Sequence, residues 1–87
     1  MRQADPSELA KLIGEIGKSS EFGSRIKQVR VEAEEDDEAD AFLRVYILLE
    51  NSSDLDWNKV APLVSRIEEK VASVDDRFPS VHFADAV

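Results

Sequence analysis

The chain has 87 residues and no cysteine, which predicts one small domain over residues 1–87, excludes disulfide frameworks and thiolate metal sites, and fits a cytoplasmic location. Its apolar runs are far shorter than the about 20 residues that span a bilayer, and its first residues show no signal-peptide pattern, so we predict no membrane association. The net charge of −8 repels phosphate backbones and argues against nucleic-acid binding.

A helix is predicted near the start of the chain. In Asp5-Pro6-Ser7-Glu8 the aspartate can accept from first-turn N–H groups, proline suits the first helical position, and glutamate completes a capping box. One apolar stripe follows at helical spacing, formed by Leu9, Leu12, Ile13 and Ile16. Gly17 and the Ser19-Ser20 pair are expected to end the helix. Gly14 lies inside it, where a small loss of helix propensity would permit close packing.

Two strands are predicted next from alternating residue types. Over residues 25–33, Val29, Val31 and Ala33 alternate with polar residues, as in a half-buried strand. Over residues 41–50 every odd position is apolar. The even positions of that stretch are half apolar as well, namely Phe42, Arg44, Tyr46 and Leu48. The second strand is therefore expected to be central, with its second face also partly covered.

The two strands are expected to form a hairpin, and their charges favour one register. Pairing Arg30 with Arg44 would oppose like charges. A shift of two residues places Glu32 opposite Arg44 and Arg30 opposite Tyr46, which is favourable for both arginines. We predict the second register.

An acidic connection over residues 34–40 joins the strands. Its carboxylates belong to Glu34, Glu35, Asp36, Asp37, Glu38 and Asp40. The segment could be a solvated connection that discourages other chains from pairing with the sheet edge, or a docking site for a basic protein. A Ca²⁺ or Mg²⁺ site is a third possibility, but the spacing of a calcium loop and its glycine are missing. We assign the six carboxylates as candidate partner-binding residues.

A second helix is predicted after a capping loop at residues 51–54. Its apolar stripe comprises Trp57, Val60, Ala61, Val64, Ile67, Val71, Val74 and Phe78. We expect Trp57 to anchor this helix on the sheet, and Asp54 and Asp56 to serve as caps. Because Pro62 is incompatible with an undisturbed helix interior, we expect a short helical turn over residues 55–60 and a kink or restart at Pro62.

The tail at residues 80–85 is predicted to be a short third strand, returning beside the hairpin through a crossover. The fold class is thus α+β, an α-β-β-α-β two-layer sandwich in which both helices cover one face of a three-stranded sheet. The other face carries an apolar patch with nothing in the chain left to cover it, which suggests a two-fold dimer. The predicted dimer interface comprises Arg30, Phe42, Arg44, Tyr46 and Leu48.

Motifs for catalysis or metal binding are weak. The run Gly14-Glu15-Ile16-Gly17-Lys18-Ser19 has leucine at position 12, where a P-loop needs glycine, and follows a helix instead of a strand. A helix C-terminus with packing glycines explains it better than an RNA-binding loop does. His82 has no accompanying nucleophile or base motif, and with Asp85 it gives only two metal donors. We predict no enzyme activity, no catalytic or metal site, and no cofactor.

The element order and the terminal Val81-His82-Phe83 strand resemble the small cytoplasmic domain of cation diffusion facilitator transporters. The resemblance covers most of the chain in pattern and implies a domain that dimerises and binds metal through histidine and carboxylates. Only His82 matches a ligand position, so no metal site is carried over.

The composition therefore favours a small acidic non-enzymatic protein-interaction module, expected to be a homodimer. One form of such a module is a regulator or antitoxin-like neutraliser of a basic partner. The alternative is a metal-responsive dimeric domain like that of cation diffusion facilitators.

Overall fold

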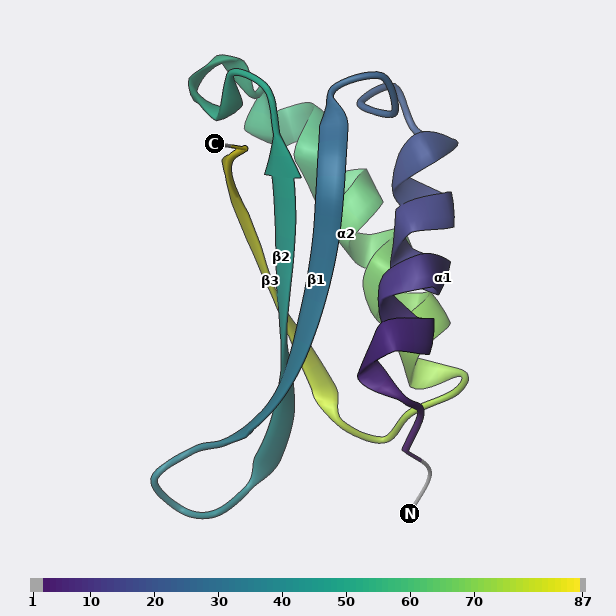
Figure 1. The fold of residues 1–87 in the computed structure, drawn as a ribbon, viewed down its shortest axis with the longest axis vertical. Helices are drawn as coiled ribbons and strands as arrows, with labels where there is room; N and C mark the ends of the chain where they lie inside the picture. Colours follow the sequence, from purple (N-terminus) through teal and green to yellow (C-terminus); the bar gives the residue numbers. More distant parts are fainter. Residues whose placement is uncertain (1–2, 87) are drawn as a thin grey trace.

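Two helices lie on one face of a three-stranded sheet (Figure 1). The computed structural model describes residues 3–86, so Met1, Arg2 and Val87 of the predicted domain lie outside the described residues. The elements in chain order are α1 (Pro6–Lys18), β1 (Ile26–Glu35), β2 (Ala41–Leu49), the 3-10 turn η1 (Ser52–Asp54), α2 (Trp57–Ala72) and β3 (Phe78–Asp85). This order confirms the predicted α-β-β-α-β fold. Neither helix within residues 3–86 has the length and apolar character needed to cross a bilayer.

The sheet has β2 at its centre, as predicted, with β1 antiparallel on one side and β3 parallel on the other. The hairpin register places Arg30 opposite Tyr46 and Glu32 opposite Arg44. The register predicted from charge is therefore confirmed. In this register, the even-numbered side chains of β2 lie on the sheet face away from the helices.

The first strand is longer than predicted. Glu34 and Glu35, which were assigned to the acidic connection, pair in the ladder with Phe42 and Ala41. The Glu34 carboxylate lies 2.9 Å from the Arg44 guanidinium, and this cross-strand pair helps to keep an acidic residue in the sheet. The connection itself is thus confined to residues 36–40.

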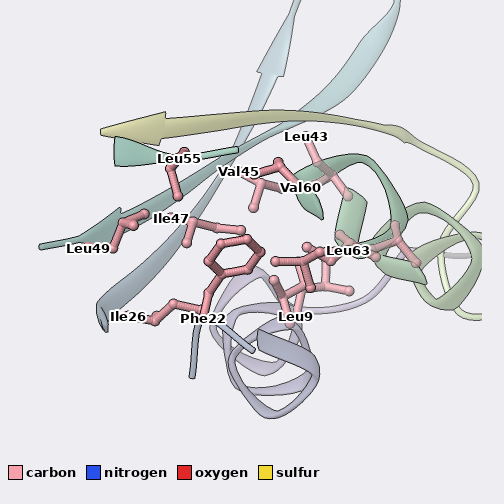
Figure 2. Packing of buried hydrophobic residues seen from close by; sticks show 13 residues of the cluster. Leu9, Phe22, Ile26, Leu43, Val45, Ile47, Leu49, Leu55, Val60 and Leu63 are labelled. Atoms are coloured by element: carbon pink, nitrogen blue, oxygen red, sulfur yellow. The ribbon is translucent and has the colours of Figure 1, made fainter. Parts of the chain in front are cut away.

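The core lies between the helices and the sheet (Figure 2). The strand β2 contributes its odd-numbered residues from position 43 onward, and each helix contributes one apolar stripe. The most deeply buried members are Leu9, Ile13, Leu43, Val45, Ile47, Leu49, Val60, Ile67 and Val71, each at most 1% exposed. Because an extended strand alternates its side chains, β2 buries one face completely and leaves the other available.

The helix α2 differs from its prediction at both ends. It begins at Trp57, because the Asp56 carboxylate accepts from the Asn58 N–H, and it continues through Pro62 without a restart. Proline lacks the N–H that would bond to the Asn58 carbonyl, but both residues are exposed and water can satisfy that acceptor. The expected turn over residues 55–60 is therefore wrong, since the separate short turn is η1, at Ser52–Asp54.

The stripe predicted for α2 is also wrong at its margins. The buried positions are Val60, Leu63, Ile67 and Val71. Trp57 is 64% exposed and makes a T-shaped ring contact with Phe83, so it is not the buried anchor of the helix. Val74 and Phe78 lie beyond the end of α2, and Phe78 is the first residue of β3.

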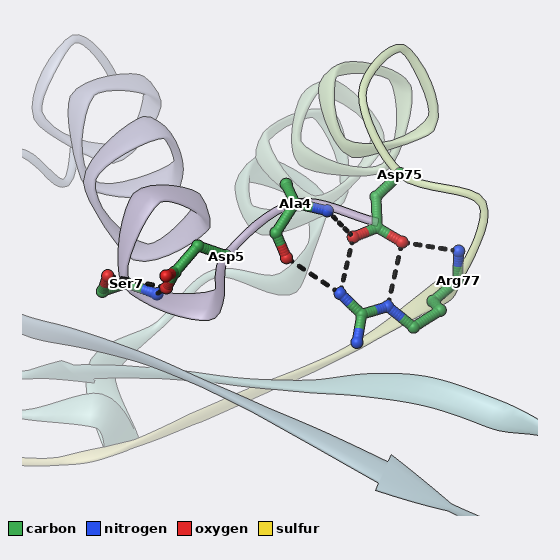
Figure 3. Close-up of polar contacts among 5 residues, drawn as sticks. All are labelled: Ala4, Asp5, Ser7, Asp75 and Arg77. Carbon is green, nitrogen blue, oxygen red and sulfur yellow. Dashed lines mark hydrogen bonds and ion pairs between the residues drawn. The ribbon is translucent and has the colours of Figure 1, made fainter. Parts of the chain in front are cut away.

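A buried ion pair joins the chain before α1 to the turn before β3 (Figure 3). The Asp75 carboxylate lies 2.8 Å from the Arg77 guanidinium and also accepts from the Ala4 N–H at 2.9 Å. Arg77 in turn donates to the Ala4 carbonyl at 3.0 Å. These hydrogen bonds, the one from Arg77 first, lower the pKa of Asp75 to about 2. The pair, named here the Asp75–Arg77 clasp, ties the segment before α1 to the turn before β3.

Candidate functional site

The candidate site is the face of the sheet that points away from both helices, named here the open face. The central strand contributes the four residues predicted from sequence, Phe42, Arg44, Tyr46 and Leu48, all half-buried. Arg30 lies beside them on β1 and is exposed. The structure thus brings all five predicted interface residues together on one surface.

Arginine side chains cover part of the aromatic surface on the open face. The Arg30 guanidinium lies 5.3 Å from the centre of the Tyr46 ring, and Arg44 lies 5.5 Å from the Phe42 ring centre. Both separations fall within the range of cation–π attraction. The face is therefore amphipathic, with apolar rings beneath arginines that are ion-paired with Glu32 and Glu34.

Arg44 is only partly satisfied on this face. The Tyr46 hydroxyl, then the Glu34 carboxylate, raise the pKa of Arg44 above its ordinary value. Its Nε atom is shielded from solvent but has no hydrogen-bond acceptor among the described residues. A shielded donor without an acceptor is destabilising, so an acceptor supplied from outside the chain would be favourable here.

The third strand adds residues to the open face that the sequence did not assign to it. The parallel register places Phe78 beside Phe42, and His82 beside Tyr46. Phe78 is 64% exposed, and the Tyr46 and His82 ring centres are 5.7 Å apart. The signal that could have found them is parity, because residues paired in a parallel register project on the same face.

His82 has two polar or aromatic neighbours in the described structure. Its Nε2 lies 3.1 Å from the Ser80 hydroxyl, and its ring lies against Tyr46. A serine–histidine catalytic pair also needs a group that orients the imidazole and donors for a developing oxyanion. The contacts of His82 within residues 3–86 include neither, so this geometry does not build a nucleophilic site.

The described residues of one chain also supply too few donors for a metal centre. Within the described residues, no group of three or more histidine, aspartate or glutamate side chains is placed to hold a metal ion. The two donors weighed from the sequence differ in environment, since Asp85 accepts from the Ser52 N–H and His82 bonds to Ser80. The described residues of a single copy therefore do not fit a zinc site.

The acidic connection forms an ordered turn at the end of the hairpin, where it projects away from both helices (Figure 1). The Asp36 carboxylate accepts from the N–H groups of Glu38 and Asp40, and Ala39 adopts a left-handed conformation with φ of 62°. Asp36 therefore has a structural part in the turn. The remaining predicted partner-binding carboxylates, those of Asp37, Glu38 and Asp40 with Glu35, are exposed.

Comparison with known proteins finds likeness in structure but none in sequence. No family model matches the chain, and no curated protein matches it. The fold is similar to a solved structure of CzrB, described as a zinc transporter, with a TM-score of 0.62 and 13% identity over 98% of this chain and 100% of that chain. It is also similar to the zinc form of CzrB, with a TM-score of 0.57 and 15% identity over 98% and 93% of the two chains. At such identity the likeness establishes the fold.

Proposed function

We propose that this chain is a non-enzymatic regulatory domain that acts as a homodimer, of the kind found in the cytoplasmic part of cation diffusion facilitators. The observation that carries the proposal is the fold, which matches the CzrB structure over the full length of that chain.

The open face supports dimerisation through its composition. It combines half-buried apolar side chains, the exposed Phe78 ring and the unpartnered Nε of Arg44. A second copy placed across a two-fold axis would bury the rings and could bring acceptors to Arg44. We infer that Tyr46 and Leu48 lie near the centre of this interface.

The test is a double substitution, Tyr46→Glu with Leu48→Glu, which places two charges on the open face. We expect a folded variant that has lost association through the open face, seen as a lower mass in sedimentation equilibrium, because burying unpaired carboxylates is strongly unfavourable. The matched control is Ala61→Glu with Ser65→Glu, which adds the same charge to the exposed side of α2 and should keep the parental mass. A double variant of the open face that also keeps the parental mass would place any dimer elsewhere.

A response to zinc is a more specific version of the same function. It is favoured by the zinc form among the structural matches and by the exposed position of His82 on the open face. Since the donors of one chain do not suffice, zinc would require donors from two copies. We expect zinc to raise the melting temperature of the parent and not that of His82→Ala. If zinc does not change the melting temperature of the parent, the response to zinc is excluded and only the proposed dimer is retained.

The acidic connection keeps its predicted role as a docking site for a basic protein, which is the second candidate function. Its exposed carboxylates at the tip of the hairpin favour it. Capture of partners at low salt, followed by elution at high salt, would identify such a protein. Loss of capture with Asp37→Ser and Glu38→Ser would assign the binding to the connection, whereas unchanged capture would exclude it.

A further inference from the structure

The outer edge of β1 is open and lies beside a groove lined with lysines. Within the described residues β1 pairs only with β2, so half of its backbone N–H and C=O groups face away from the sheet. A cavity of about 420 Å³ separates this edge from α1. Its charged lining is Lys11, Glu15, Lys18 and Lys27, with Ala10, Ile26 and Val29 among the apolar members. This groove is locally basic in a chain whose net charge is −8.

Charges along β1 run from basic to acidic. The strand begins beside Lys27 and ends in Glu34-Glu35, with Arg30 and Glu32 between them. A strand with this polarity complements a copy of itself in antiparallel orientation, because each basic end then meets an acidic end. The only irregularity in the register lies between Ile26 and Gln28, so the rest of the strand is regular.

Three two-fold registers can be compared directly. Centring the pairing on Arg30 opposes two arginines, and centring it on Glu32 opposes two glutamates. Centring it on Val31 places Arg30 opposite Glu32 of the second copy, twice, and Val29 opposite Ala33. Of these three registers, only the one centred on Val31 avoids directly opposed like charges and places Arg30 opposite Glu32.

We propose that the outer edge of β1 joins a second copy of this chain in that register, forming a continuous six-stranded sheet. Continued past the irregularity at Ile26–Gln28, the same register brings Glu35 of the second copy toward Lys27, whose Nζ lies 2.9 Å from Glu50 of its own chain. It also brings Glu35 toward the groove beside α1, which Lys18 lines. The acidic hairpin of each copy thus meets the basic groove of the other. The interface is separate from the open face, because it uses the strand edge and leaves that face accessible.

The experiment exchanges charges in the Tyr46→Glu, Leu48→Glu background, so that association through the open face is absent. The first variant carries Lys18→Glu and Lys27→Glu, and the second carries Glu35→Lys and Asp37→Lys. Each alone opposes like charges at both ends of the interface, and we expect its dimer dissociation constant to rise about a hundredfold. Mixed together, the two variants restore opposite charges at both ends and should form a heterodimer, detected by native mass spectrometry.

The charge-matched control carries Lys59→Glu and Lys70→Glu on α2 and should associate like its background. Circular dichroism verifies that each variant folds. If the background itself does not fold, the same exchanges are made in the parent, where they should remove one association step and the mixture should restore it. Unchanged association of either variant alone, or absence of a heterodimer in the mixture, would overturn the proposal. Failure of the open face to mediate a dimer would leave these outcomes unaffected, so the two proposals are tested separately.

Discussion

Two ion pairs of nearly equal length show how differently the two sides of this sheet are built. Asp75 and Arg77 lie 2.8 Å apart on the helix-covered side, with side chains 0% and 8% exposed. Glu34 and Arg44 lie 2.9 Å apart on the open face, with side chains 33% and 39% exposed. The first pair is held by further hydrogen bonds to Ala4, whereas the second leaves the Arg44 Nε without an acceptor. Burial therefore makes one pair structural and leaves the other available to a partner.

The largest effect should come from breaking the buried pair. We expect Asp75→Ala to lower the free energy of unfolding by about 3–5 kcal/mol, because it leaves the Arg77 guanidinium buried without its partner. Glu34→Ala, the matched change on the open face, should lower it by less than about 1 kcal/mol. Urea denaturation at one protein concentration measures both. Equal losses would contradict the contrast between the two sides.

Adjacent residues of β2 test the same contrast for apolar side chains. Ile47 is 0% exposed in the core, and we expect Ile47→Ala to lower the free energy of unfolding by about 2–5 kcal/mol. Leu48 projects from the open face and is half-buried, so Leu48→Ala should lower the monomer's stability by about 1 kcal/mol. The measurement is denaturant titration of both variants at a protein concentration low enough to prevent association. A larger loss for Leu48→Ala would be inconsistent with the observed burial.

Acid should weaken the Asp75–Arg77 clasp as the Asp75 carboxylate becomes protonated. The pKa of Asp75 is lowered in the folded state from 3.8 to about 2, so its stabilisation is complete above pH 4 to 5. It should be lost as the pH falls from about 4 toward 2, to a total of about 2 kcal/mol. Stability against pH, compared between the parent and Asp75→Asn, isolates this part. Parallel curves would mean that Asp75 does not titrate as described.

The smallest effects should come from the two glycines within α1. An added Cβ at Gly14 would meet no atom within 4 Å, so Gly14→Ala should raise the free energy of unfolding by about 0.5–1 kcal/mol. A Cβ at Gly17 would lie 2.7 Å from Ile26 Cδ1, so Gly17→Ala should lose part or all of that gain. Thermal melts distinguish the two. An equal gain at both positions would show that Ile26 moves freely.

The expected close packing at Gly14 is not observed, and it occurs at Gly17 instead. Close packing was expected at Gly14, but the atoms that approach α1 closely are at Gly17, on the face toward Ile26. Periodicity identifies a helix and its apolar stripe, yet it does not tell which neighbouring element approaches most closely. The Asp75–Arg77 clasp was missed for a similar reason, because the Ala4 backbone is distant from it in the sequence.

Local patterns were sufficient for the elements, the central position of β2 and the hairpin register, because alternation and cross-strand charge act between near neighbours in the chain. They were also sufficient to place Arg30, Phe42, Arg44, Tyr46 and Leu48 on one surface. The tertiary structure alone showed that Phe78 and His82 lie beside them and that Trp57 is exposed. It alone also showed that Asp75 bonds to the segment before α1. Each of these depends on how β3 and α2 return to the sheet, and that return is determined by burial of the whole core, which no single stretch of sequence contains.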